Sequence, residues 1–223
     1  MSSKVAVCSF FAISGMRGSG RTRLFRKLES ALPATFRDHT FAFFEDPFVA
    51  LPHPLLWARE ESELDPTSRL FKCWVALNEF NKKLRPALDE FDVVVVDGYG
   101  LNAVLYATAF VGDNKEDDDS ATRMHHHLVK ARILEQGISP PEYFITRADA
   151  GEMSTYLREV VPGISVEQCR AFIQKEERII REYFGPGTGQ NGHILEPSCS
   201  FESAVEDVVA VIGRRLASAR VAA

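Results

Sequence analysis

The chain has 223 residues, and its 26 Lys and Arg against 31 Asp and Glu give a formal net charge of −5. Apolar residues make up 45% and charged residues 26%, a composition that supports an ordinary soluble core within a single domain. The acidic balance argues against general binding to nucleic acids or membrane surfaces, because both present negative charge.

Cysteine spacing and hydropathy further restrict the class of protein and its expected compartment. The four cysteines form no CxxC pair, which favours reduced thiols over a disulfide or a metal site. No apolar run reaches the roughly 18 residues that a membrane span needs. Met1–Lys4 leads directly into an apolar segment, so we expect no signal peptide. A cytoplasmic location is the expectation, with a mitochondrial one as the alternative.

The first part of the chain predicts a strand, a tight loop and a helix. Val5–Ser14 is apolar and rich in strand-forming residues, as in a buried parallel strand. A glycine-rich turn follows, and Thr22–Leu32 carries apolar residues at helical spacing. Thr40–Phe44 predicts a second strand, which ends at Glu45 and Asp46.

The middle of the chain predicts a long helix and a central strand. Ser68–Leu88 places apolar side chains on one helical face, and Phe91–Asp97 is a continuous valine run. Leu101–Val111 and Ala121–Gln136 predict two further helices.

Strands and helices continue to alternate up to the end of the sequence. The predicted strands here are Tyr143–Thr146 and His193–Leu195, after a turn at Gly185–Gly192, and the predicted helices are Ala150–Val160, Val166–Phe184 and Phe201–Ala219. This alternation predicts one α/β domain over residues 1–223, with about five parallel strands and helices on both faces of the sheet.

The glycine-rich turn fits the phosphate-binding P-loop pattern G-x-x-x-x-G-K-[ST] except that Arg21 replaces the lysine. Glycines allow successive backbone N–H groups to turn toward a phosphate, and the start of the helix adds its positive dipole end. The residues expected to hold the phosphates of ATP are Gly15, Gly18, Ser19, Gly20, Arg21 and Thr22. The Thr22 hydroxyl is also a candidate ligand for Mg²⁺.

Acidic residues end two of the predicted strands. Asp97 follows the valine run, and Glu45 and Asp46 follow the strand before it. Ligands of open α/β sheets bind at the carboxyl ends of the strands, so these carboxylates should converge near the P-loop. Asp97 is therefore a second candidate ligand for Mg²⁺ and a candidate catalytic group. A turn-capping role for each residue remains the alternative.

In a series of segments that follow one another in the same order, the chain resembles the thymidylate kinase family, a group of P-loop nucleoside and nucleoside-monophosphate kinases. The segments that carry the resemblance are FFAISGMRGSGRTRL, FFEDP, RLFKCWVALNEFNKKLRPALDEFDVVVVDGYG, ISPPEYFIT and GHILEPSCSFESAVEDVV. The resemblance implies the P-loop three-layer fold, with RPAL forming a turn and a lid-like segment near residues 158–170. It also implies ATP as donor, a nucleoside or nucleoside monophosphate such as dTMP as acceptor, and Mg²⁺.

The resemblance also assigns residues. Phe71 matches the phenylalanine that stacks on the acceptor base, and the acceptor site would further include Glu45, Asp46, Tyr99, Asn102 and Tyr106. Asp97 matches the aspartate of an Asp-Arg motif. The family commonly dimerises through helices, which makes Ser68–Leu88 a candidate interface.

Several charged positions of the family are altered. Gly98 stands in place of the Asp-Arg arginine, Glu45 in place of the arginine of Arg-Glu-Pro, and Ala76 in place of a helix arginine. Arg17 is a gained charge in the P-loop and a candidate catalytic group, with Arg21 and Asp97. Catalysis of phosphoryl transfer consists mostly of placing and neutralising negative charge, so these losses weaken it.

Two hypotheses follow from this pattern. In the first, the chain binds nucleotide with weak or lost phosphotransfer, as a scaffold or regulatory protein within a larger assembly, for example a mitochondrial one. In the second, it is an active ATP-dependent nucleoside-monophosphate kinase.

Overall fold

The structure is a computed structural model that describes residues 8–15, 18–48, 66–108, 123–124, 138–147, 149–184, 191–195 and 200–222. Its strands are β1 (Ser9–Gly15), β2 (Phe41–Phe44), β3 (Val93–Asp97), β4 (Glu142–Thr146) and β5 (Asn191–Leu195). Its helices are α1 (Arg21–Thr35), α3 (Pro66–Glu90), α4 (Gly100–Thr108), α6 (Ala150–Val160), α7 (Val166–Tyr183) and α8 (Phe201–Ala222). The predicted Arg17 lies outside the described residues, as does most of the helix expected over Ala121–Gln136.

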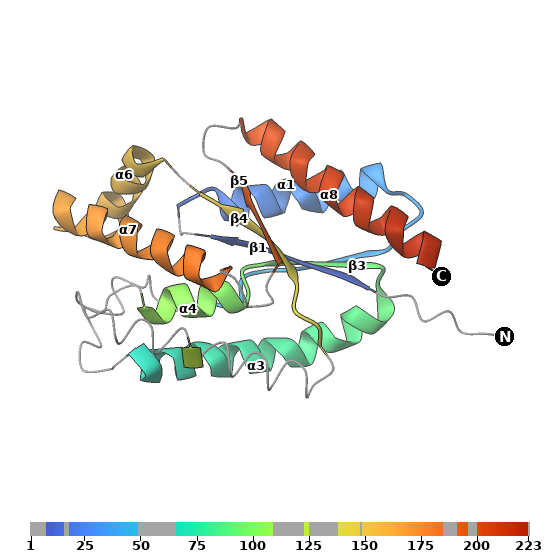
Figure 1. The fold of residues 1–223 in the computed structure, drawn as a ribbon, viewed down its shortest axis with the longest axis horizontal. Helices are drawn as coiled ribbons and strands as arrows, with labels where there is room; N and C mark the ends of the chain where they lie inside the picture. Colours follow the sequence, from blue (N-terminus) through green and yellow to red (C-terminus); the bar gives the residue numbers. More distant parts are fainter. Residues whose placement is uncertain are drawn as a thin grey trace.

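The five described strands form one parallel sheet in the order β2-β3-β1-β4-β5, which confirms the predicted α/β class (Figure 1). The chain moves from β1 to one side of the sheet and later crosses to the other side. β1 therefore lies at the point where the strand order reverses, with β3 and β4 as its neighbours. Ligands of such sheets bind outside the carboxyl ends of the strands at this point.

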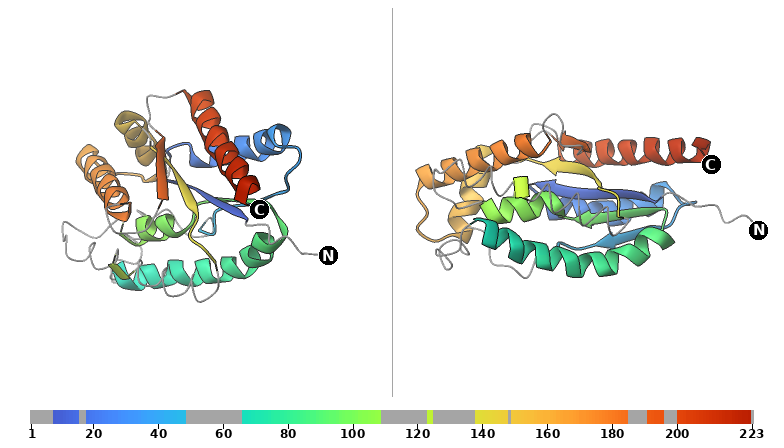
Figure 2. Two further views of the ribbon diagram at one scale, coloured as in Figure 1. Left: turned by 45° about the vertical axis from the view of Figure 1, so that its right-hand side comes forward. Right: turned by 60° about the horizontal axis from the view of Figure 1, so that its bottom comes forward.

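Two layers of helices enclose the sheet, because successive strand residues point to opposite faces. Phe10 and Ala12 of β1 join the core on the side of α3, α4 and α7, whereas Phe11 and Ile13 join the core beneath α1 and α8. The valines of β3 divide in the same way. Figures 1 and 2 show α1 and α8 on one side of the sheet and α3 and α4 on the other.

Two expectations about element ends were wrong. The turn that the resemblance implied for RPAL is not formed, since α3 continues through Pro86 to Glu90, in agreement with the helix predicted over Ser68–Leu88. The loss of one backbone hydrogen bond at proline is offset there by the burial of Leu84 and Ala87. β5 begins at Asn191, earlier than expected, because it pairs with β4 from that residue on.

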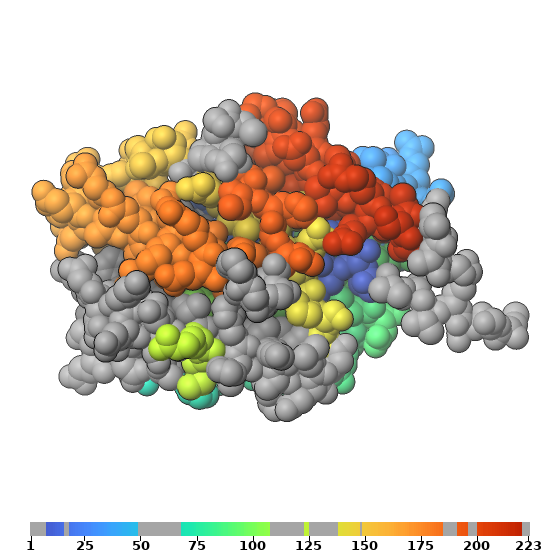
Figure 3. All heavy atoms as spheres, viewed as in Figure 1, coloured from blue at the N-terminus to red at the C-terminus, as the bar shows by residue number. Residues whose placement is uncertain are grey.

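The segment expected to form a lid, near residues 158–170, lies at the end of the molecule where β1 leads into α1. There α6 packs on α7, and residues 161–165 connect them (Figure 1). The space-filling view shows α7 and α8 over much of the described part of one face (Figure 3). Within the described residues, no helix has the length and apolar character that a membrane crossing would require.

Candidate functional site

The P-loop connects the buried strand β1 to α1. Gly15, Gly18 and Gly20 all have positive φ angles, a conformation that side chains other than glycine rarely adopt. Gly20 is the residue that precedes the helix, and no side chain caps the free N–H groups that follow. The first turn of α1, all of which is described, contains no acidic residue. The start of α1 therefore offers free donors and a positive dipole end to an anion.

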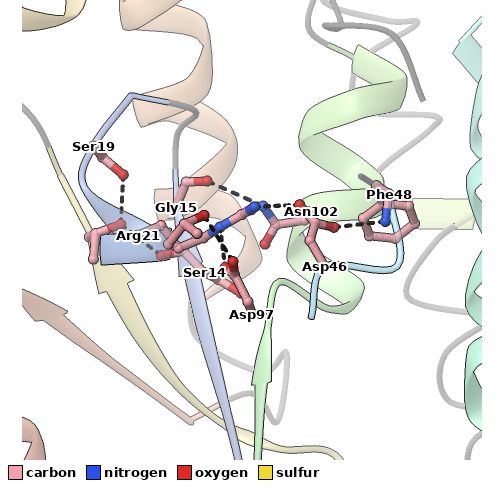
Figure 4. Close-up of polar contacts among 10 residues, drawn as sticks. Ser14, Gly15, Ser19, Arg21, Asp46, Phe48, Asp97 and Asn102 are labelled. Atoms are coloured by element: carbon pink, nitrogen blue, oxygen red, sulfur yellow. Dashed lines mark hydrogen bonds and ion pairs between the residues drawn. The ribbon is translucent and has the colours of Figure 1, made fainter. Parts of the chain in front are cut away.

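Neighbouring strands and helices hold the loop in place. Asn102 of α4 donates from Nδ2 to the Gly15 carbonyl at 3.2 Å. On the other side, Ser19 Oγ and Thr146 Oγ1 lie 2.6 Å apart, and Thr146 also donates to the Ser14 carbonyl. The loop is thus fixed to elements on both sides of β1 before any ligand binds (Figure 4).

Arg21 is directed toward two carboxylates at the carboxyl edge of the sheet. Its Nη2 pairs with Asp46 Oδ2, and its Nε lies 2.6 Å from Asp97 Oδ1 (Figure 4). Only 6% of Arg21 is exposed, and both aspartates are buried as well. A buried ion pair is favourable only when its remaining polar atoms are also satisfied.

The remaining carboxylate oxygens are also engaged. Asp46 Oδ1 accepts from the Phe48 backbone N–H at 2.7 Å, and Asp97 Oδ2 accepts from the Thr22 hydroxyl at 2.9 Å. Burial raises the pKa of Asp97 above its ordinary value, although Arg21 and the Thr22 hydroxyl both act to lower it. The sequence expectation that the strand-end acids converge on the P-loop is met by Asp46 and Asp97.

A cavity of about 510 Å³ opens beside this cluster. It is lined by Gly18, Gly20, Arg21, Thr22, Arg23, Arg26, Glu45, Asp46, Asp97 and Tyr156. Arg26 pairs with Glu29 and Glu45 at the exposed rim, and the Arg23 guanidinium lies 4.1 Å from the centre of the Phe201 ring. The cavity thus adjoins the P-loop, the first turns of α1 and the two strand ends.

The Tyr156 side chain of α6 packs against the P-loop at Gly18. A Cβ atom added to Gly18 would lie 2.5 Å from the Tyr156 ring, so that only glycine allows the ring to approach the backbone so closely. Sequence analysis missed Tyr156, Arg23 and Arg26. An arginine two or five positions beyond Arg21 on an amphipathic helix looks like an ordinary solvent-facing residue, and nothing in the sequence places α6 above Gly18.

Four residues expected in the acceptor site are not among those that line the cavity. Tyr99 is fully buried and donates to Asn81 Oδ1 of α3 at 2.8 Å. Tyr106 is buried with its ring 5.4 Å from that of Phe48, and Asn102 supports the P-loop. Phe71 lies on α3 with 49% of its surface exposed. Their roles toward an acceptor stay predictions.

A charged residue that the sequence did not single out is buried in α3. Arg69 is 4% exposed and lies one turn before Cys73, on the same helical face. Burial raises the pKa of the Cys73 thiol, and the negative charge of Asp46 adds to the effect. This face of α3 is therefore directed toward Asp46. Ala76, where the family places an arginine, lies two turns beyond Arg69.

Comparison with known proteins supports an assignment of the fold. No protein-family model and no curated protein matches the sequence. Among solved structures, deoxyadenosine kinase from M. mycoides, with the products dCMP and dCDP bound, matches with a TM-score of 0.58 and 10% identity over 92% of this chain and 99% of that one. The same enzyme with bound dATP gives 0.58, 12% identity and coverage of 91% and 98%. Thymidylate kinase from Ehrlichia chaffeensis gives 0.55, 16% identity and coverage of 92% and 98%.

This chain has the fold of the thymidylate and nucleoside kinases. The predicted resemblance is confirmed at that level, and in this fold Gly98 stands directly after the strand-end Asp97. Gly98 has a φ angle of 80°, and an added Cβ would lie 3.2 Å from Arg21 Nη1 and 3.3 Å from Asp46 Oδ1. Any side chain at this position would therefore need the Arg21 cluster to shift by a few tenths of an ångström, in addition to the strain of its positive φ angle.

The kinase fold implies Mg²⁺, whose ligands were expected to be Thr22 and Asp97. Carboxylate and hydroxyl oxygens suit this ion. The hydrogen bond from Thr22 to Asp97 also leaves the hydroxyl lone pairs available. However, each oxygen of Asp46 and Asp97 already contacts Arg21, Thr22 or the Phe48 amide. As the side chains stand, the carboxylates do not fit a directly bound ion, because Arg21 occupies the space between them.

Proposed function

We propose that the chain is a nucleotide-binding protein of the kinase fold whose phosphoryl transfer is slow or lost, and that it acts as a scaffold or regulatory protein. The observation that carries this proposal is the position of Arg21. Its guanidinium is held by Asp46 and Asp97, whose carboxylates already neutralise the charge that a phosphate would need.

Nucleotide binding is supported by the parts of the site that do not depend on Arg21. The free N–H groups at the start of α1 and the glycines of the loop form an anion site. The cavity is large enough for a phosphate chain, and Arg23 adds positive charge along its wall. The neighbour solved with dATP makes a purine nucleoside triphosphate such as ATP the first ligand to test.

Slow phosphoryl transfer is supported by a comparison of the positive charges that the reaction requires with those that the site offers. A transferred phosphoryl group carries spread negative charge, and a single arginine can contribute about 10³–10⁵-fold to its rate of transfer. Arg21 Nη1 is buried beside Gly98 and has no hydrogen-bond partner within the described residues, while Nε and Nη2 face the aspartates. Gly98 itself supplies no charge.

The second candidate is an active nucleoside-monophosphate kinase, and the contact between Thr22 and Asp97 favours it. This hydrogen bond joins the first turn of α1 to the end of β3 at 2.9 Å. If Arg21 turned outward to the phosphates, Asp97 and Thr22 would be free to position an ion or an acceptor hydroxyl.

Calorimetry with ATP and an assay for ADP release across a panel of nucleosides and monophosphates distinguish these candidates. We expect ATP binding without turnover. Turnover that an Asp97→Asn change abolishes would establish the kinase instead. Absence of ATP binding would remove both candidates.

A matched pair of glycine variants tests the binding site. Gly20 and Gly163 have φ angles of 79° and 80°, and an added Cβ at either one has no atom within 4 Å. Gly20→Ala and Gly163→Ala therefore introduce the same backbone strain. Only Gly20→Ala places a methyl group in the cavity, so it alone should weaken ATP binding. Equal affinities of the two variants would contradict binding at the loop.

A further inference from the structure

Arg21 is the counter-ion of a closed carboxylate pair. Two neighbouring nitrogens of one guanidinium contact Asp46 and Asp97, so an oxygen from each carboxylate lies beside the same planar cation. The two remaining oxygens accept from the Phe48 amide and the Thr22 hydroxyl. Figure 4 shows the side chain of Arg21 between Asp97 and Asp46.

The guanidinium is enclosed on its third side as well. Nη1 would lie 3.2 Å from a Cβ placed on Gly98, and it is buried without a hydrogen-bond partner in the described part of the chain. The absence of a side chain at Gly98 thus provides the space that the arginine fills. A flexible surface arginine would have at least one nitrogen in water, whereas only 6% of Arg21 is exposed.

A divalent cation and this guanidinium need the same oxygens. Mg²⁺ in phosphate-binding proteins is bound through one or two carboxylates together with phosphate oxygens, and it keeps several waters. Asp46 and Asp97 are the buried carboxylates at the phosphate end of the cavity, and Arg21 already neutralises one of their two charges. A metal ion bound directly to them would meet the guanidinium at the same position.

We propose that Arg21 takes the place of the divalent cation in this site, so that the chain binds nucleotide phosphate without a metal ion. Removal of the guanidinium then converts Asp46, Asp97 and the Thr22 hydroxyl into a divalent-cation site. The statement about nucleotide rests on the proposed function, and the statement about the metal does not.

The metal is tested with Mn²⁺ alone, with the free ion measured by electron paramagnetic resonance. Arg21→Met should bind Mn²⁺ at least about tenfold more tightly than the wild type, and Arg21→Met/Asp97→Asn should lose the gain. Equal Mn²⁺ affinity of the wild type and Arg21→Met, or a gain that survives Asp97→Asn, overturns the proposal. If Arg21→Met does not fold, Arg21→Gln replaces it, because its amide keeps one donor for the carboxylates.

Arg26→Met is the matched control for this measurement. Arg26 also lines the cavity and also pairs with two carboxylates, those of Glu29 and Glu45, but half of its side chain is exposed. Its removal should create no Mn²⁺ site, because the freed carboxylates are open to water and not buried together like Asp46 and Asp97. A gain equal to that of Arg21→Met would show that any missing arginine has this effect, and would overturn the proposal.

The nucleotide is tested with ATP and the wild-type protein. ATP affinity with EDTA should lie within about twofold of the affinity with Mg²⁺, whereas Arg21→Met should bind at least about tenfold more tightly with Mg²⁺ than without it. A wild-type affinity that depends tenfold on Mg²⁺ overturns the proposal. If ATP does not bind under either condition, the proposed function fails while the Mn²⁺ measurements still decide whether Arg21 excludes the metal.

Discussion

Replacement of Asp46 by asparagine tests whether the buried cluster exists in solution. In the Asp46→Asn variant the side-chain carbonyl can still accept from the Phe48 amide, but the new NH₂ group faces Arg21 Nη2, so that donor meets donor. Arg21 then keeps only its contact with Asp97, at 2.6 Å. The variant removes one charge-assisted hydrogen bond and leaves the packing volume nearly unchanged.

The expected loss of stability follows from what remains. Removal of the sole partner of a buried ion costs about 3–5 kcal/mol, and a single hydrogen bond to a charged group contributes about 1.5–3 kcal/mol. Because Asp97 still neutralises Arg21, we expect a loss of about 2 kcal/mol in the free energy of unfolding. In a chain of this size that lowers the melting temperature by about 4–8 °C.

The adjacent residue provides the control. Glu45→Gln makes the same charge change one position earlier, but Glu45 is 64% exposed and pairs with an exposed arginine at the rim. Screening by water makes such pairs weak, so its melting temperature should stay within the error of the measurement. The assay is urea and thermal unfolding, followed by circular dichroism at low and high salt. If Asp46→Asn and Glu45→Gln have the same melting temperature, the buried cluster is not formed and the argument from Arg21 fails.

Three further predictions concern the stability of the fold. Gly98→Ala should cost about 1–2 kcal/mol of unfolding free energy, because alanine is strained at positive φ, and an unchanged denaturation midpoint would contradict this. Tyr99→Phe leaves the buried Asn81 oxygen without its donor and should cost about 1–3 kcal/mol in the same assay. Burial acts to raise the pKa of Glu142, but hydrogen bonds from Arg215 and the neighbouring imidazole outweigh it, so the pKa is lowered. Its stabilisation should therefore be full above the ordinary value of 4.5 and disappear as the pH falls below it, and unfolding midpoints of Glu142→Gln that follow the wild type at every pH would refute this.

Local sequence patterns were sufficient for the order of the elements. The valine run of β3 could only be a strand covered on both faces, and α6 has the bounds that its apolar spacing indicated. The patterns failed at β5, where pairing with β4 extends the strand to Asn191. The resemblance, which implied a turn at RPAL, was wrong at Pro86, where burial keeps α3 helical. At both places the deciding contact comes from a distant part of the chain.

The candidate site likewise has parts that the sequence predicted and parts that only the tertiary structure shows. The P-loop follows from glycines that are adjacent in sequence, and the convergence of Asp46 and Asp97 follows from the rule that parallel strands end at one edge. Tyr99 and Tyr106, expected near an acceptor, instead pack among buried side chains. The residue type alone does not show whether an aromatic side chain after a strand lines a cavity or packs in the core. Only tertiary packing distinguishes the two positions.

The sequence by itself determined the fold class, the glycine-rich loop and the absence of arginine at several positions where the family that it resembles has one, because each depends on residue types at fixed spacing along the chain. The tertiary structure decided where Arg21 is directed. From sequence, an arginine in place of the P-loop lysine is expected to hold phosphate. The fold sets Asp46 and Asp97, from two other strand ends, within reach of it and leaves space at Gly98. Over such short distances in a buried site, attraction between opposite charges directs the side chain toward the two carboxylates.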